Sequence, residues 1–132
     1  MMYALDTNII SYILKRNLAI TEKFIIEKEK GNTFNIPPLV YYEINRGLVS
    51  VNATRMMREF DKLCRQLKVG EMTKAIWNEA VKIYVGLKKQ GRLIDDADIF
   101  IAAYCISFGY TLVTNNSEHF GRVENLNYVN WK

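Results

Sequence analysis

The stretch MYALDTNII, residues 2–10, places a short apolar run directly before three polar residues. Met2–Leu5 has the length and composition of a buried strand, and the polar residues Asp6–Asn8 end it. A helical pattern then runs through Ile9–Lys15. A strand followed closely by a helix is the unit of an α/β fold. Asp6 falls at the carboxyl end of this strand, where open α/β sheets carry their ligand sites.

The rest of the chain repeats this alternation of strand and helix. Further short strands are predicted at Thr33–Ile36, Leu67–Val69, Thr111–Val113 and, at the edge, Tyr128–Trp131. Further helices are predicted at Thr21–Lys30, Leu39–Val49, Val51–Leu67, Thr73–Gln90 and Ala97–Ser107. These elements favour an α/β sandwich in which helices flank a mostly parallel sheet. With 132 residues and no repeat or linker, the chain is predicted to form a single domain, 1–132.

The composition indicates a globular protein with a modest basic excess. Apolar residues make up 49% of the chain, enough for a hydrophobic core, and the net charge of +4 suits a polyanionic partner without requiring one. No apolar run approaches the roughly 20 residues of a membrane span. Cys64 and Cys105 lie among helix-patterned apolar residues, which predicts buried free thiols and a reducing compartment. We therefore expect a soluble, cytoplasmic protein.

Three carboxylates stand where an acidic side chain is unusual. Asp6 follows the first strand, and its alternative role is to cap the next helix. Glu43 lies on or beside the apolar face of the helix Leu39–Val49, where a buried ion pair with a basic residue is the alternative. Asp98 lies one turn before the most apolar part of the helix Ala97–Ser107. Carboxylates that point inward need a cation, a partner or a raised pKa.

A polar trio, Thr114, Asn115 and Asn116, follows the strand Thr111–Val113 and would reach the same edge of the sheet as Asp6, unless it forms only a turn. Converging carboxylates and amides suit hard divalent cations such as Mg²⁺ or Mn²⁺. Such ions activate water and stabilise phosphate groups. A basic protein with an acidic metal cluster is typical of a phosphodiesterase that acts on nucleic acid.

Four segments and a closing dipeptide together resemble PIN-domain proteins of the VapC type. They are LDTNII at residues 5–10, LVYYEINRGL at 39–48, IDDADIFIAA at 94–103, LVTNNSEHF at 112–120 and NW at 130–131. The resemblance spans nearly the whole chain. It implies a PIN-like sandwich and a metal-dependent, single-strand-selective endoribonuclease that cleaves structured RNA such as tRNA. It also implies Mg²⁺ or Mn²⁺ as cofactor, a homodimer, and a VapB-like antitoxin that silences this toxin.

The resemblance also assigns roles to individual residues. The family's three acids fall on Asp6, Glu43 and Asp98, which would hold the metal. Asp96 matches an acid seen in some relatives and is a candidate outer ligand. Asn116 occupies a fourth position that is often Asp, and a neutral amide there would weaken the hold on a second ion. The residues expected to orient the site are Thr7, Asn8, Thr114 and Asn115.

Residues outside the acids carry weaker expectations. The candidates for RNA contact are Arg46, Lys88, Lys89 and Arg92. Arg46 could instead pair with Glu43 one helical turn away, and charge runs are usually solvated surface. The stripe Met56–Leu63 is predicted to be core, with an antitoxin-docking surface as the alternative. His119, the only histidine, is predicted to be a surface turn residue, so a zinc site is not expected.

Two competing functions are set against the ribonuclease. A catalytically silent PIN-like module that binds RNA or a partner is suggested by Asn116, but such a module has no need for three inward acids. A phosphatase-like enzyme with Asp6 as nucleophile is disfavoured, because Asp-Thr-Asn lacks the second Asp that would act as acid and base. The absence of GxxxxGK and GxGxxG excludes a P-loop or dinucleotide fold.

Overall fold

A four-stranded parallel sheet in the order β2-β1-β3-β4 lies at the centre of the computed structural model, which describes residues 1–132. The strands are β1 (Met2–Leu5), β2 (Thr33–Asn35), β3 (Thr111–Val113) and β4 (Tyr128–Val129). β1 is an inner strand, and its Ala4 pairs in register with Asn35 on one side and Leu112 on the other. The carboxyl ends of β1 and β3 therefore lie side by side.

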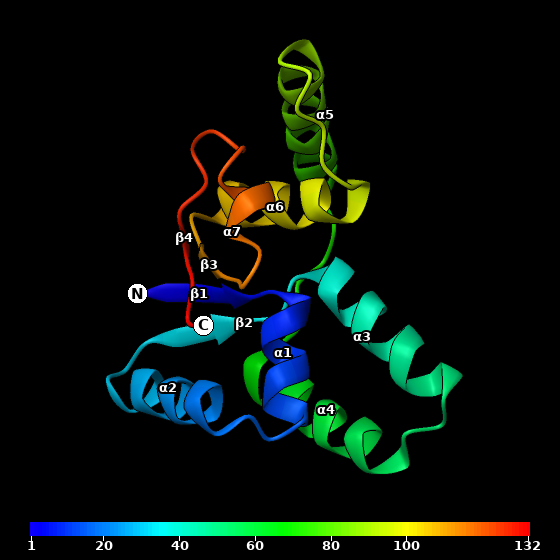
Figure 1. The fold of residues 1–132 in the computed structure, drawn as a ribbon, viewed down its shortest axis with the longest axis vertical. Helices are drawn as coiled ribbons and strands as arrows, with labels where there is room; N and C mark the ends of the chain where they lie inside the picture. Colours follow the sequence, from blue (N-terminus) through cyan, green and yellow to red (C-terminus); the bar gives the residue numbers. More distant parts are fainter.

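Seven helices flank the sheet. They are α1 (Thr7–Leu14), α2 (Leu18–Glu29), α3 (Pro38–Ser50), α4 (Thr54–Leu67), α5 (Lys74–Lys89), α6 (Asp96–Phe108) and α7 (Ser117–Phe120). Figure 1 shows α1 to α4 gathered on one side of β1, and α5, α6 and α7 on the other. α3 also packs against α6, so the two groups of helices meet beside the sheet. The predicted α/β sandwich with a mostly parallel sheet is confirmed.

β1 and α6 are almost continuously apolar in sequence because both are buried in the core. Tyr3, Ala4 and Leu5 of β1 are buried, as an inner strand covered on both faces requires. α6 is buried around most of its circumference, including the continuous run Ile101–Cys105. α5 packs on α6 and then stands out from the rest of the molecule (Figure 1). No helix combines the length and the apolar character that a membrane span requires.

Several helix boundaries differ from the sequence prediction where a local cap or turn intervenes. α2 begins at Leu18 rather than Thr21, because the Asn17 side chain accepts a hydrogen bond from a first-turn amide and caps the helix. α4 begins at Thr54, later than predicted. Asn52 just before it has a φ of 52°, in the left-handed region, and this turn separates α3 from α4.

The predicted strand Leu67–Val69 is wrong, and one helix was not predicted. Leu67 still belongs to α4, and Lys68 adopts a φ of 68°, which breaks an extended run. Only an isolated bridge between Ile36 and Val69 remains. Ser117–Phe120, for which the sequence predicted no helix, forms the short helix α7.

Gly70 lies against the ring of Tyr104, the largest fully buried side chain. Its amide donates to the carbonyl of Ile36, which holds the backbone in place next to the ring. The Tyr104 hydroxyl donates to the side chain of Asn35 at the end of β2. A β-carbon at residue 70 would collide with the Tyr104 hydroxyl and ring. This position therefore has no room for any side chain.

We expect Gly70→Ala to lower the free energy of unfolding by about 1–3 kcal/mol, because overpacking must displace the Tyr104 ring. Urea denaturation measures the change. Gly86→Ala is the matched control: Gly86 is a mid-helix glycine of α5 with open space around it, so alanine there should stabilise by about 0.5–1 kcal/mol. Equal stability of Gly70→Ala and the parent protein would contradict the close packing at Tyr104.

Candidate active site

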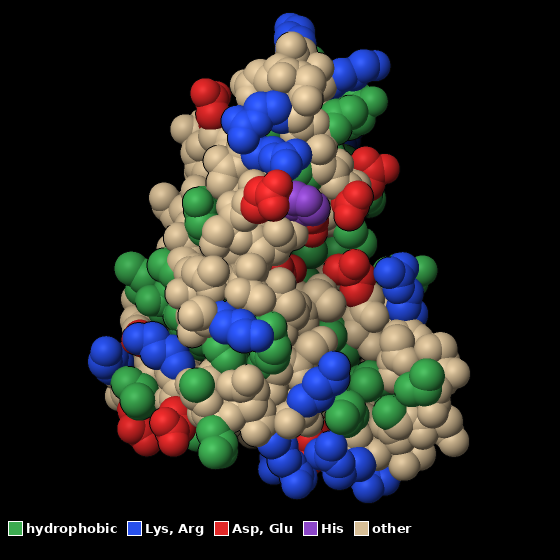
Figure 2. Space-filling view, viewed as in Figure 1, with side chains coloured by type: hydrophobic (Ala, Val, Ile, Leu, Met, Phe, Trp, Pro, Cys, Tyr) green, Lys and Arg blue, Asp and Glu red, His purple; other side chains and the backbone are tan.

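A polar hollow of about 430 Å³ opens at the carboxyl edge of the sheet. Its lining comes from α1 and the residue before it, from α3, from α6, and from the residue before α7. The lining residues are Asp6, Thr7, Asn8, Ser11, Tyr12, Lys15, Glu43, Asp98 and Asn116. Figure 2 shows acidic side chains gathered in the middle of this face, with Lys and Arg side chains toward its margins. We refer to this hollow as the acidic pocket.

Asp6 is both a helix cap and a member of the acidic pocket. Its Oδ1 accepts a hydrogen bond of 2.8 Å from the Thr7 amide at the start of α1, and its Oδ2 accepts one of 2.7 Å from the Thr114 hydroxyl. Only 4% of the residue is exposed. Burial raises the pKa of the carboxyl to about 6, and the charges of Asp98 and Glu43 add to the rise. The cap alone does not account for so unfavourable a carboxylate, since N-caps are normally exposed to water.

Glu43 enters the acidic pocket from α3 and is half-buried, with 22% of its side chain exposed. The Thr7 hydroxyl donates to its Oε1 at 2.8 Å. Arg46 approaches the other oxygen only to 3.9 Å and is itself well exposed. An exposed pair at that distance contributes little, so the buried ion pair considered for Glu43 is not what holds it. Thr7 connects the two acids, because its amide binds Asp6 and its hydroxyl binds Glu43.

Asp98 lies in the first turn of α6, and 17% of its side chain is exposed. Its Oδ2 is 2.9 Å from Nδ1 of His119, and the Asn116 side-chain nitrogen is 3.0 Å from the same ring nitrogen. An ionised carboxylate can only accept, so His119 donates to Asp98 from Nδ1. The prediction that His119 is a surface turn residue is therefore wrong. The signal in the sequence for a role of His119 at the site was its position three residues after Asn116, since one helical turn brings two such residues together.

The acids near Asp98 are arranged differently from the sequence prediction. Asp95, Asp98 and His119 offer ligand atoms that all lie within 4.8 Å of one another. Asp6, Glu43 and Asp98 do not approach each other as closely as a set. Asp96 is exposed and belongs to neither arrangement. Helical geometry explains the difference, since residues three apart share a face and residues two apart do not.

Hydrogen bonds between the residues that follow β1 and those that follow β3 fix the remaining side chains of the acidic pocket. The Asn115 amide donates to the Asn8 side chain at 3.1 Å, and the Asn115 side chain donates to the Tyr12 hydroxyl. The Thr114 hydroxyl, which donates to Asp6, also accepts from the Asn116 amide at 2.9 Å. The residues expected to orient the site, with Thr7, therefore all form hydrogen bonds within or beside the acidic pocket.

The basic residues divide by position. Lys15 lines the acidic pocket and forms no ion pair there, although sequence analysis did not single it out. Arg46 lies at the pocket's edge beside Glu43. Lys88, Lys89 and Arg92 do not line the acidic pocket and belong to the protruding end of α5 and the loop after it (Figure 1).

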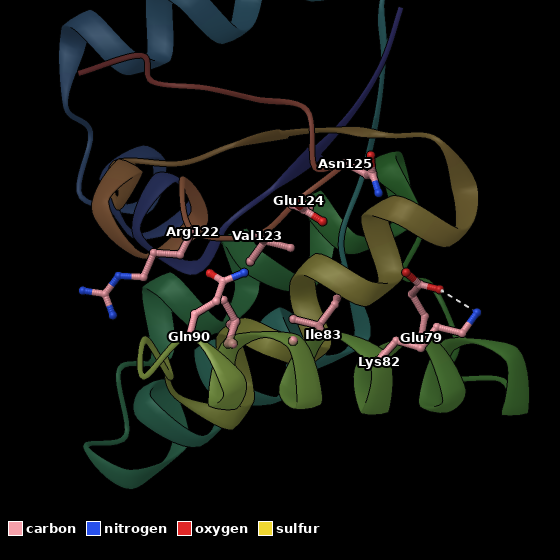
Figure 3. Close-up of a pocket in the computed structure, with 10 residues that line it drawn as sticks. Glu79, Lys82, Ile83, Gln90, Arg122, Val123, Glu124 and Asn125 are labelled. Atoms are coloured by element: carbon pink, nitrogen blue, oxygen red, sulfur yellow. Dashed lines mark ion pairs between the residues drawn. The ribbon is translucent and has the colours of Figure 1, made fainter.

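A second hollow lies between α5 and residues 122–125, and Figure 3 shows the side chains that line it. Charged side chains of this hollow already contact other groups of the protein. Glu79 lies 4.0 Å from Lys82, and Arg122 donates to the carbonyls of Arg92 and Leu93. No converging acids, histidine or cysteine line this hollow. The acidic pocket is the candidate reactive site, because its converging carboxylate oxygens suit a divalent cation.

Comparison with known proteins agrees with this geometry. Residues 3–126 match the family described as the PIN domain. Ribonuclease VapC2 of Haemophilus influenzae is 31% identical over 98% of this chain and 97% of the relative. Ribonuclease VapC1 of Methanocaldococcus jannaschii is 34% identical over 90% and 79%, respectively.

Two solved structures superpose along nearly the full chain. One is a chain of VapBC2 from Rickettsia felis bound to a DNA fragment from their promoter, with a TM-score of 0.91 and 26% identity over 100% of both chains. The other is a chain of VapBC-1 from nontypeable Haemophilus influenzae, with a TM-score of 0.85 and 29% identity over 99% of this chain and 98% of that one.

The raised pKa of Asp6 predicts a pH-dependent stability. Because the folded-state pKa of about 6 exceeds the ordinary aspartate pKa of 3.8, Asp6 contributes stability below about pH 4, and this is lost as pH rises through 6. In EDTA at pH 8, Asp6→Asn should be at least as stable as the parent protein, and its relative stability should fall by on the order of 2–3 kcal/mol toward pH 4. Urea denaturation at several pH values measures this difference. Exposed Asp96→Asn is the control and should show no such trend. A constant difference between Asp6→Asn and the parent across this range would refute the buried-carboxylate account.

Proposed function

This chain belongs to the PIN domain family as a VapC-type ribonuclease toxin, and from that premise we propose that the acidic pocket is its active site and cleaves RNA with the help of a divalent cation. The observation that carries the proposal is the burial of Asp6 beside two further carboxylates, which raises its pKa. Such a group is costly to ionise unless a cation joins it.

The donor set fits a hard cation, and we assign its binding to Asp6, Glu43 and Asp98. Carboxylate oxygens are preferred by Mg²⁺ and Mn²⁺, which we propose as the cofactors. Asp6 keeps free lone pairs, because each of its oxygens accepts one hydrogen bond and has room for another ligand. When bound, the cation would lower the pKa of a coordinated water and stabilise negative charge on the phosphate.

The chain's own residues hold the acids in place. Thr7 orients Asp6 and Glu43 together, and Thr114 donates to Asp6. His119 donates to Asp98 and so fixes which of its oxygens faces the acidic pocket. We assign His119 the role of a positioning residue and Asp95 that of an additional outer acid, in place of Asp96.

No side-chain thiol is suited to act as the nucleophile. Burial raises the pKa of Cys105 well above its usual range. Cys64, which is half-buried rather than buried, has its pKa raised to about 11, chiefly by desolvation. Neither thiol is ionised near neutral pH. Water is therefore the proposed attacking group, and the reaction needs no covalent intermediate.

Asn116 lies at the acidic pocket with its amide against His119. A neutral side chain there supports one tightly held cation rather than two. The alternative of a silent RNA-binding module is less well supported, because three inward carboxylates are each held by a specific hydrogen bond. Those bonds would serve no purpose in a module that only binds RNA.

The partners we propose follow from the relatives, which are named as VapBC assemblies, one of them bound to promoter DNA. We propose a VapB-like antitoxin as this toxin's partner, a homodimeric assembly built from one domain per chain, and single-stranded regions of structured RNA such as tRNA as substrate. The stripe on α4 is unsuited to docking the antitoxin, since Phe60 and Leu63 are buried and Met56 packs against the core.

Purified protein should cut single-stranded RNA when Mg²⁺ or Mn²⁺ is present and stop when EDTA is added. Asp98→Asn should reduce the cleavage rate by at least about 100-fold, because loss of a ligand costs more than loss of an outer-shell partner. Asp96→Asn on the same helix is the matched control and should cut at nearly the parent rate. Gel-resolved cleavage of a labelled RNA measures all three proteins. Undiminished cleavage in excess chelator would contradict the metal assignment.

Induced expression in bacteria should arrest growth, and Asp98→Asn should relieve the arrest while the protein remains soluble and folded. The reason is that the toxic effect is the cleavage itself and not a binding event. Colony counts after induction, with immunoblots to match protein levels, give the measurement. Equal toxicity of the parent and a folded Asp98→Asn protein would mean that the toxin acts without the proposed acid.

A further inference from the structure

Two aromatic rings, each with a cation over it, belong to helices that contribute to the acidic pocket. Tyr12 comes from α1 and lines the pocket, and Nζ of Lys132 lies 4.5 Å from the centre of its ring. Tyr42 comes from α3, next to Glu43, and the Arg46 guanidinium lies 5.2 Å from the centre of its ring. One pair thus lines the pocket, and the other is linked to it through Arg46, which lies 3.9 Å from Glu43.

These rings are available to a ligand. Tyr42 is 56% exposed, although aromatic side chains of this size are usually at least partly buried. Tyr12 is half-buried and packs against the core, and its hydroxyl accepts from the Asn115 side chain and from Lys132, so its ring is fixed in orientation. The Lys132 ammonium, which lies over the ring, would move aside for a stacked base. A fixed ring at the wall of a pocket loses little freedom when a flat group stacks on it.

The cations around the acidic pocket are poorly neutralised by its acids. Lys15 lines the pocket but lies within 4.0 Å of no carboxylate, and Arg46 reaches Glu43 only at 3.9 Å. Lys132 contacts the Tyr12 hydroxyl rather than an acid. A polyanion that must approach several carboxylates is repelled unless cations stand beside them. Three such cations are therefore placed where the phosphates on either side of a scissile bond would pass.

Resting on the proposed ribonuclease function, we propose that Tyr12 and Tyr42 are base-stacking platforms for a single RNA strand that crosses the acidic pocket. Lys15, Arg46 and Lys132 contact the phosphates of that strand. Aromatic stacking of this kind accepts any base but requires the base to be unpaired. The two platforms therefore give the enzyme its preference for single-stranded RNA, and the bases on either side of the cleaved bond stack on different helices.

A third cation–aromatic pair provides a matched control. Nζ of Lys88 lies 5.8 Å from the centre of the Tyr84 ring on the protruding end of α5. This pair has the same chemistry and a comparably exposed ring, but it does not line the acidic pocket (Figure 1). Substitutions there test whether any exposed pair of this type binds RNA.

The test measures binding separately from cleavage. Every variant is made in the Asp98→Asn background and titrated in EDTA against a fluorescent, non-self-complementary 12-nucleotide RNA, either single-stranded or annealed to its complement.

Tyr12→Leu and Tyr42→Leu should each weaken single-strand binding by about fivefold or more and leave duplex binding unchanged. Tyr12→Phe should recover most of the single-strand affinity that Tyr12→Leu loses, because it keeps the ring and lacks only the hydroxyl bonds that fix it. Lys15→Gln, Arg46→Gln and Lys132→Gln should each reduce the slope of log affinity against log salt by about 0.7. Tyr84→Leu and Lys88→Gln should change neither quantity.

Several outcomes would overturn the proposal. One is single-strand affinity of folded Tyr42→Leu within twofold of the background, since Tyr42 is exposed and its loss should not unfold the protein. Another is an equal loss caused by Tyr84→Leu. A third is competition by a poly-glutamate peptide of matched charge as effective as that by RNA, which would make the surface a site for polyanions or acidic protein segments. Failure of the proposed cleavage reaction would leave these binding results unaffected, so the two ideas fail separately.

Discussion

The burial of the Asp6 carboxylate at the end of the inner strand β1 is the constraint around which the site is organised. Its backbone amide extends the pairing of β1 with β3 by donating to Val113, and hydrogen bonds from the Thr7 amide and the Thr114 hydroxyl hold its side chain inward. Both carboxylate oxygens accept a hydrogen bond, yet burial still raises the pKa to about 6. The fold therefore keeps a destabilising charge in a fixed position, as sites that bind ligands often do.

Side-chain hydrogen bonds that start from Asp6 connect elements that are far apart in sequence and fix their relative positions. The Thr7 hydroxyl donates to Glu43 on α3. The Thr114 hydroxyl, after β3, donates to Asp6 and accepts from the backbone amide of Asn116. From Asn116 the contacts continue to His119 and then to Asp98 on α6. Each acid thus comes from a different helix or strand end. A shift of any one of these elements would alter the spacing of all the acids.

The same arrangement places several acidic groups in one pocket, where burial makes ionised Asp6 costly. Inward carboxylates repel one another, and the helices that carry them must still pack tightly, as Gly70 against Tyr104 on α6 illustrates. A bound cation would replace repulsion by attraction without any movement of the backbone. The surrounding cations Lys15, Arg46 and Lys132 are held back from the acids, so the acidic pocket remains open to a charged ligand.

Local sequence determined much of this protein. The period of apolar residues placed the sheet strands and the helices, and the switch from apolar to polar residues at Asp6 and Thr114 marked the carboxyl edge of the sheet. The structure brings Asp6, Glu43 and Asp98 to one pocket, as those patterns suggested. A side-chain cap from Asn17 shifted the start of α2, and a turn at Asn52, whose φ is positive, shifted the start of α4.

Tertiary structure alone decided which side chains meet. It placed His119 against Asp98 across a separation of 21 residues, and it carried Lys132 to Tyr12 while Lys88 remained on the protruding end of α5. Periodicity records which face of an element is buried. Contacts between residues distant in sequence depend instead on how the elements pack, and a single sequence carries no local signal for that distance.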